Sequence, residues 1–205
     1  MKIEQYIIEN FKENEPFEAK DIIYPFPNIN QQLKRLAERN IIAKFQTGIY
    51  YIPSYEYGFK SVPDIYKLIR KKYLIDSVGR TIGFIGGYRL INELNLTTQF
   101  SRECEIYTNK ATTKQRKIQI GSECIILKKP PVDICDENIG IIKFINVLEN
   151  EYYFETNKET TDSILKQLIN VNGVTKELVR KYVTYYPDKI CRTLIERGIY
   201  DLIQR

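Results

Sequence analysis

The sequence predicts an α+β protein with two parts. These are an N-terminal winged helix-turn-helix domain, residues 1–57, and a larger C-terminal α+β domain, residues 58–205, with a small sheet and several helices. Three observations predict it. Apolar residues recur at helical spacing early in the chain, and two short apolar runs follow on either side of a glycine. Beyond a polar connector, the chain contains both apolar patterns typical of strands and apolar patterns typical of helices.

The first helix is predicted over residues 2–13, because its apolar residues are spaced three or four apart: Ile3, Tyr6, Ile7 and Phe11. Pro16 ends it. Phe17 is expected to be extended, and residues 19–24 to form a second helical turn. Asn28, the last residue of PFPN, is the expected N-cap, with Gln31 three residues later in a capping-box pattern, so a helix is predicted over residues 28–40.

Two short strands are predicted next, IIAKF and IYYIP, joined by a turn over residues 46–48. Gly48 can take the positive φ that such a turn requires. Helix, short extended piece, helix, helix and hairpin follow one another within 53 residues. That succession is the element order of a winged helix-turn-helix.

Residues 54–62, SYEYGFKSV, form a polar connector that contains a glycine and is the predicted domain boundary. Beyond it, the patterns predict helices over 64–78 and 87–94, strands over 81–86, 103–109 and 116–129, and helices over 137–150, 161–171, 175–186 and 188–203. In the last helix Asp188 is the expected N-cap, and Gly198 marks a bend.

Composition excludes several classes of protein. No apolar run approaches the roughly 18 to 20 residues that span a bilayer, and the N-terminus carries acids where a signal peptide is apolar, so a cytoplasmic protein is expected without membrane contact. Histidine is absent, which excludes a Ser-His-Asp triad, a His-based zinc site and a Cys-His pair. The four cysteines form no C-x-x-C pair and are expected to be reduced core residues.

Catalytic patterns are weak. Asp133 and Asp136 suggest the metal-binding carboxylates of a nucleotidyltransferase, but a spacing of three puts them on opposite faces of a strand, unlike D-x-D. GFIGG lacks the G-x-G-x-x-G pattern of a phosphate loop. We therefore expect no enzyme, no cofactor and no metal, although an enzyme that uses Asp, Glu, Lys or Ser remains an alternative.

The predicted helix over residues 28–40 has two faces. Ile29, Leu33 and Leu36 fall within about 60° of one another and face the core. The opposite face carries amide and basic side chains, which read base edges in the major groove, and it has no acid before Glu38. With a phosphate contact from the first wing strand, the predicted DNA-binding residues are Asn28, Asn30, Gln31, Lys34, Arg35 and Lys44.

Charge qualifies this prediction. Residues 1–57 hold seven basic and eight acidic side chains, a net charge of −1, whereas residues 58–205 hold 24 and 18, a net charge of +6. A near-neutral domain binds DNA weakly as a single copy, so two copies on a repeated or inverted site are expected. The alternative is a protein-interaction module whose winged helix does not bind DNA.

Two basic stretches stand out in the second part, KLIRKK (67–72) and KATTKQRK (110–117). Each is either a solvated surface or a positive surface for an acidic or phosphate-rich partner. The residues predicted to bind a partner are Lys110, Lys114, Arg116 and Lys117.

Four short segments carry a family resemblance: GIYYIP (48–53), GYRLINEL (87–94), NLTTQ (95–99) and IYTN (106–109), with RKIQIG after them. Together they resemble the AbiEi-type antitoxins of bacterial type IV toxin–antitoxin systems over roughly residues 1–130. The sequence departs from the family pattern at Asn95, where a glycine is common.

The resemblance implies two roles. The N-terminal domain would bind inverted repeats in its own promoter, as double-stranded DNA, and repress transcription. The C-terminal domain would neutralise a nucleotidyltransferase-like toxin encoded by the neighbouring gene. No catalytic residue is implied.

Overall fold

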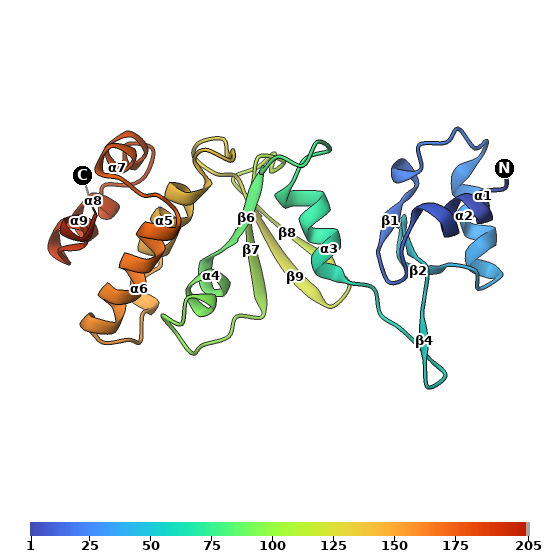
Figure 1. Cartoon of the computed structure of the whole chain (residues 1–205), viewed down its shortest axis with the longest axis horizontal. Helices are drawn as coiled ribbons and strands as arrows, with labels where there is room; N and C mark the ends of the chain where they lie inside the picture. The colour runs from blue at the N-terminus through green and yellow to red at the C-terminus, as the bar shows by residue number, and fades with distance from the viewer. Residues whose placement is uncertain (204–205) are drawn as a thin grey trace. The chain divides into compact units, whose positions relative to one another are not determined.

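The computed structural model describes residues 1–203 of a mixed α+β protein (Figure 1). The chain divides into two compact units, Met1–Lys72 and Tyr73–Arg205. The boundary therefore follows Lys72, whereas the predicted boundary follows Tyr57. Within the described residues, no helix has the length and apolar character needed to cross a membrane.

The first unit opens with a helix, a short strand, a single 3-10 turn and a second helix, followed by a hairpin (Figure 1). Their bounds are α1 (Ile3–Asn10), β1 (Phe17–Glu18), η1 (Ala19–Asp21), α2 (Ile29–Glu38), β2 (Ala43–Gln46) and β3 (Ile49–Tyr51). The three strands form one antiparallel sheet in the order β1-β3-β2. Gly48, with φ of 77°, makes the turn between β2 and β3, as predicted.

The core of the first unit explains this arrangement. Helix α2 buries Leu33 and Leu36 on one face. They belong to a cluster of buried residues drawn from both helices, from β1 and from the hairpin: Ile3, Ile7, Phe17, Ile22, Leu33, Leu36, Ile42 and Tyr50. The predicted capping box at Asn28 is wrong. Asn28 has left-handed φ and ψ and makes no side-chain cap, so the N–H groups of Gln31 and Gln32 bond its backbone carbonyl instead.

The predicted connector over residues 54–62 contains a small hairpin, β4 (Tyr55–Glu56) and β5 (Phe59–Lys60). Tyr57 and Gly58 both have positive φ at its tip, which a two-residue turn of type I′ requires. The hairpin is anchored at its base, where the backbone N–H of Ser54 donates to the Ser61 hydroxyl and Tyr51 donates to the Ser61 carbonyl. The alternating apolar pattern was too short to predict as strands.

Helix α3 (Ile65–Ile69) continues as a single π-helical turn, η2 (Arg70–Leu74), and the unit boundary falls within that turn. The remaining elements are β6 (Gly83–Gly86), α4 (Gly87–Glu93), β7 (Glu103–Thr108), β8 (Gln115–Ile120), β9 (Glu123–Lys128), α5 (Ile139–Glu149), η3 (Glu151–Tyr153), α6 (Lys158–Val171), α7 (Lys176–Val183), α8 (Lys189–Glu196) and α9 (Ile199–Leu202).

The four strands of the second unit form a sheet in the order β6-β7-β9-β8 (Figure 1). β7 and β9 are parallel, and the other pairs are antiparallel. The single strand predicted over residues 116–129 is wrong. Gly121 takes φ of 57° and reverses the chain, so the run folds into the hairpin β8–β9.

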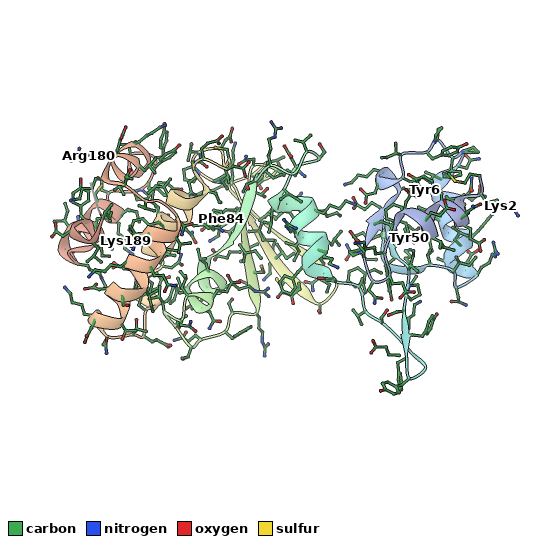
Figure 2. All side chains as sticks on the ribbon, viewed as in Figure 1. Lys2, Tyr6, Tyr50, Phe84, Arg180 and Lys189 are labelled. Atoms are coloured by element: carbon green, nitrogen blue, oxygen red, sulfur yellow. The ribbon has the colours of Figure 1, made fainter. Side chains whose placement is uncertain are left out.

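A core of sheet and helix residues centres on α5, which buries most of its length. Phe84, labelled in Figure 2, lies on β6 and stacks on Tyr107 of β7 with ring centroids 5.2 Å apart. The glycine pair beside them leaves room for close contacts. A Cβ at Gly86 would lie 2.7 Å from Asn146 Oδ1, and Gly87, with φ of 60°, donates its N–H to that same oxygen at 2.9 Å.

Helix α8 begins without the expected side-chain cap, but the bend after it lies where the sequence predicts it. Asp188 precedes α8 but makes no side-chain cap, because it is already in the helical region of φ and ψ. Gly198, with φ of 68°, separates α8 from α9 at the predicted bend. Asn95 follows Leu94, the C-cap residue of α4, and takes φ of 58°, a conformation that glycine favours and that asparagine tolerates next best.

Candidate nucleic-acid interface

Helix α2 presents one polar face to solvent. All six residues predicted to bind DNA are exposed: Asn28, Asn30, Gln31, Lys34, Arg35 and Lys44. The helix forms because Leu33 and Leu36 fix its opposite side against the core, which leaves the side chains between them pointing outward.

The helix and the hairpin share a hollow. Asn30 and Lys34 of α2 line an open surface hollow of about 400 Å³ together with Lys44 of β2. Its other lining residues are Ala37, Glu38 and Tyr50. Gln31 and Arg35 lie outside it, further round the helix, and Asn28 precedes α2. Three of the six predicted residues, Asn30 and Lys34 from the helix and Lys44 from the strand, therefore line one concave surface.

Tyr50 is the residue of this surface that the sequence analysis missed. It lies on β3 opposite Lys44 of β2, so both side chains emerge on the same face of the hairpin. Its ring is largely buried, with 8% of the residue exposed, and forms the floor between the strand and α2. The pairing of Tyr50 with Lys44 depends on an irregularity in the register of β2 between Lys44 and Gln46. The sequence does not reveal that irregularity, so it did not indicate the pair.

Ion pairs neutralise four acids of the first unit that lie outside this surface. Asp21 pairs with Lys71 at 2.8 Å, and Glu18 pairs with both Lys20 and Lys72. Burial opposes ionisation of Glu18, but these two lysines outweigh it and hold the pKa of the Glu18 carboxyl below its usual value. Two further pairs are Glu4 with Arg39 and Asp64 with Lys67.

The observed unit also has a different net charge from the predicted domain. Residues 1–72 hold twelve basic and nine acidic side chains, a net charge of +3, because the basic stretch 67–72 belongs to this unit. Lys71 and Lys72 of that stretch pair closely with acids of the same unit, so part of its positive charge is neutralised within the unit. Their effect is to neutralise acids.

Glu38 is the one acid among the residues that line the hollow. Its carboxylate lies 3.9 Å from the Lys34 ammonium, one helical turn earlier, and both side chains are largely exposed. An exposed pair of this kind is weak, so Lys34 remains available to a stronger anion.

The residues predicted to bind a partner gather around β8. Lys110 follows β7, Lys114 directly precedes β8, and Arg116 and Lys117 lie within it; all four are exposed. Lys117 reaches over β9 to pair with Glu103 of β7. The four predicted residues therefore lie on the edge strand β8 and in the loop that leads into it.

The segment 97–99 that contributes to the family resemblance is held by Glu155. The Glu155 carboxylate accepts hydrogen bonds from the Thr98 N–H at 2.7 Å, from Gln99 Nε2 at 2.7 Å and from the hydroxyls of Thr98 and Thr97. The Thr98 backbone bond contributes most, followed by Gln99, and together these bonds lower the pKa of Glu155 to about 2. The motif residues are thus occupied by a structural contact.

We expect the Glu155 contact to weaken in acid. The pKa of Glu155 is lowered from 4.5 to about 2 in the folded protein, so its stabilisation is present above pH 4.5 and is lost as the pH falls from 4.5 towards 2. Amide exchange at Thr98 measures it: exchange in the native protein should speed up over that range relative to a remote amide. In Glu155→Ala, which leaves no side-chain acceptor for the Thr98 N–H, it should be fast throughout, with no such step, and a step that survives the substitution would show that another group is responsible.

Neither the family-model scan nor the search of curated proteins finds a match to this chain. Within residues 1–203 no three or more Cys, Asp or Glu side chains form a group that could hold a metal ion. Asp133 and Asp136 lie in the loop between β9 and α5, outside any strand, and the Asp136 carboxylate accepts the N–H of Thr81 at 3.1 Å.

Proposed function

We propose that the first unit is a winged helix-turn-helix domain that binds double-stranded DNA. The proposal rests on one observation: the exposed polar face of α2 and the cation of the wing strand, Lys44, border the same concave surface. The element order and the sheet order β1-β3-β2 support it.

In this proposal α2 enters the major groove. Asn30, Gln31 and Arg35 would meet base edges, since amides pair well with adenine and a guanidinium with guanine. Lys34 and Lys44 flank the hollow and would hold phosphates, which fixes the domain on the duplex without reading sequence. Around α2 the cations Lys34, Arg35 and Lys44 outnumber Glu38, so the local charge favours DNA although the unit as a whole carries only +3.

The wider role that we propose is that of an autorepressor and antitoxin. It rests on the resemblance to AbiEi-type antitoxins: the first unit would bind repeated or inverted sites in its own promoter, and the second would neutralise a nucleotidyltransferase-like toxin. The few unpaired cations of α2 argue for two copies on paired sites, because each copy neutralises few phosphates.

A mobility-shift assay with the full chain and the DNA upstream of its own gene tests the DNA-binding half. The expected result is a shift that weakens steeply as salt is raised, since cations on α2 and β2 displace counterions. A shuffled duplex of the same length is the control. Absence of a salt-sensitive shift at micromolar protein would contradict the proposal.

The charge of the first unit favours one alternative, a protein-interaction module. About half of its acids and cations pair with one another, and the unit as a whole has a modest excess of positive charge. A stable complex with the product of the neighbouring gene, mapped to α2 and formed without any DNA shift, would favour this alternative.

If α2 faces DNA, Glu38→Gln should bind the upstream DNA more tightly, by roughly threefold at low salt. The substitution removes the acid that pairs with Lys34, which is also the one acid among the described residues that line the hollow. Glu9→Gln on α1, whose side chain bonds Gln5, makes the same charge change elsewhere in the unit and is the control. Equal effects of the two would mean that only net charge matters, and Glu38 does not face the duplex.

A further inference from the structure

Strand β8 forms an edge of the sheet in the second unit. The order β6-β7-β9-β8 pairs it with β9 on one side and with no described strand on the other. Gln115, Arg116, Lys117 and Gln119 are all exposed. Such an edge carries a row of backbone donors and acceptors that can pair with another extended chain.

The ladder identifies which groups point outward. The N–H of Lys129 donates to the carbonyl of Lys114 at 3.1 Å, so Lys114 faces β9, and every second residue after it does the same. The backbone groups of Gln115, Lys117 and Gln119 therefore point to the open side. The Gln115 carbonyl accepts the Thr113 hydroxyl at 3.3 Å, as a carbonyl directed away from β9 can.

The charge at this edge is positive and regularly spaced. Lys114 and Arg116 are two residues apart, so their side chains emerge on the same face of the sheet. Within residues 1–203 neither side chain forms an ion pair, whereas Lys117, on the other face, pairs with Glu103. The edge thus offers two cations at alternate positions beside three outward backbone positions.

A second copy of this strand is a poor occupant. In an antiparallel pair centred on Arg116 or on Lys117, the same cation from each copy would lie directly opposite its equivalent, which is destabilising. Lysine on an exposed edge commonly prevents such self-pairing. The same charges favour a strand that carries carboxylates at alternate positions.

We propose that β8 binds an extended acidic segment of a partner protein by strand addition. The segment hydrogen-bonds the outward backbone of Gln115, Lys117 and Gln119, and two of its carboxylates, two residues apart, pair with Lys114 and Arg116. This deepens the partner-binding half of the proposed function and rests on it, but it does not depend on DNA binding by the first unit.

The test uses the full chain and a short synthetic peptide that alternates valine and glutamate, followed by fluorescence anisotropy at low salt. We expect saturable binding, with slower amide exchange at Lys117 and Gln119. Lys114→Glu combined with Arg116→Glu should weaken binding by about tenfold or more. The matched control, Lys158→Glu with Lys166→Glu on exposed positions of α6, makes the same charge change and should leave binding unchanged.

Two further probes separate strand addition from charge attraction. The same peptide N-methylated at alternate amides keeps its charge but cannot pair, so it should not bind. Equal binding of the methylated peptide, equal binding of single-stranded DNA at this edge, or no binding of the unmodified peptide would each overturn the proposal. The upstream-DNA shift is measured on the same preparation, so failure of the peptide and failure of the DNA-binding half are read separately.

Discussion

Replacing Arg35 by alanine is expected to lower the affinity for the upstream DNA by about 1–3 kcal/mol, roughly 5- to 150-fold. Arg35 is exposed on the outward face of α2, and within residues 1–203 its guanidinium forms no ion pair. It is therefore free to bond a guanine through two parallel N–H donors. Fluorescence anisotropy with labelled duplex measures the change, and it should be largest on the best site and small on a shuffled duplex.

Arg39→Ala is the matched control. Arg39 directly follows α2, but its guanidinium pairs with Glu4 of α1 at 3.3 Å, so it is directed away from the proposed DNA face. It removes the same charge from the same unit. If Arg35→Ala changes affinity no more than Arg39→Ala, or weakens all duplexes equally, Arg35 contributes only charge and does not read a base.

The parts of this surface that were predicted from sequence depend on local spacing. The 3.6-residue period fixes which side of α2 carries Leu33 and which carries Arg35, and Gly48 fixes the turn of the hairpin. The two faces of α2 and the turn of the hairpin are each determined by residues only a few positions apart in the sequence, so local patterns are enough to predict them. The helices of the second unit were found for the same reason.

What the sequence could not reveal depends on residues far apart in the chain. Asp21 and Lys71, fifty positions apart in sequence, meet at 2.8 Å, and no local pattern indicates that pair. It decides whether a basic stretch is a free surface or a set of neutralised charges. The split of residues 116–129 into β8 and β9 was missed for another reason, since a glycine within a strand pattern also suits a bulge, and only the pairing with β7 settles it.

Leu33→Ala is expected to destabilise the first unit by about 2–5 kcal/mol. Leu33 is fully buried, on the face of α2 that packs against residues such as Ile7 and Phe17. The substitution leaves a cavity at the centre of a small core, where few other contacts hold α2 in place. Amide exchange followed by mass spectrometry measures the free energy of unfolding unit by unit, so the second unit serves as an internal reference.

Arg35→Ala is the control for this prediction too, because it truncates a side chain two residues away that makes no packing contact in the core cluster. It should change the stability of the first unit by less than about 0.5 kcal/mol. The two substitutions should therefore have different effects. Arg35→Ala weakens DNA binding and leaves the unit stable, whereas Leu33→Ala destabilises the unit that presents the DNA-binding face. A Leu33→Ala protein as stable as the parent would mean that packing of Leu33 in this core does not hold α2 in place. Leu33 would then not be the reason that Lys34 and Arg35 face outward.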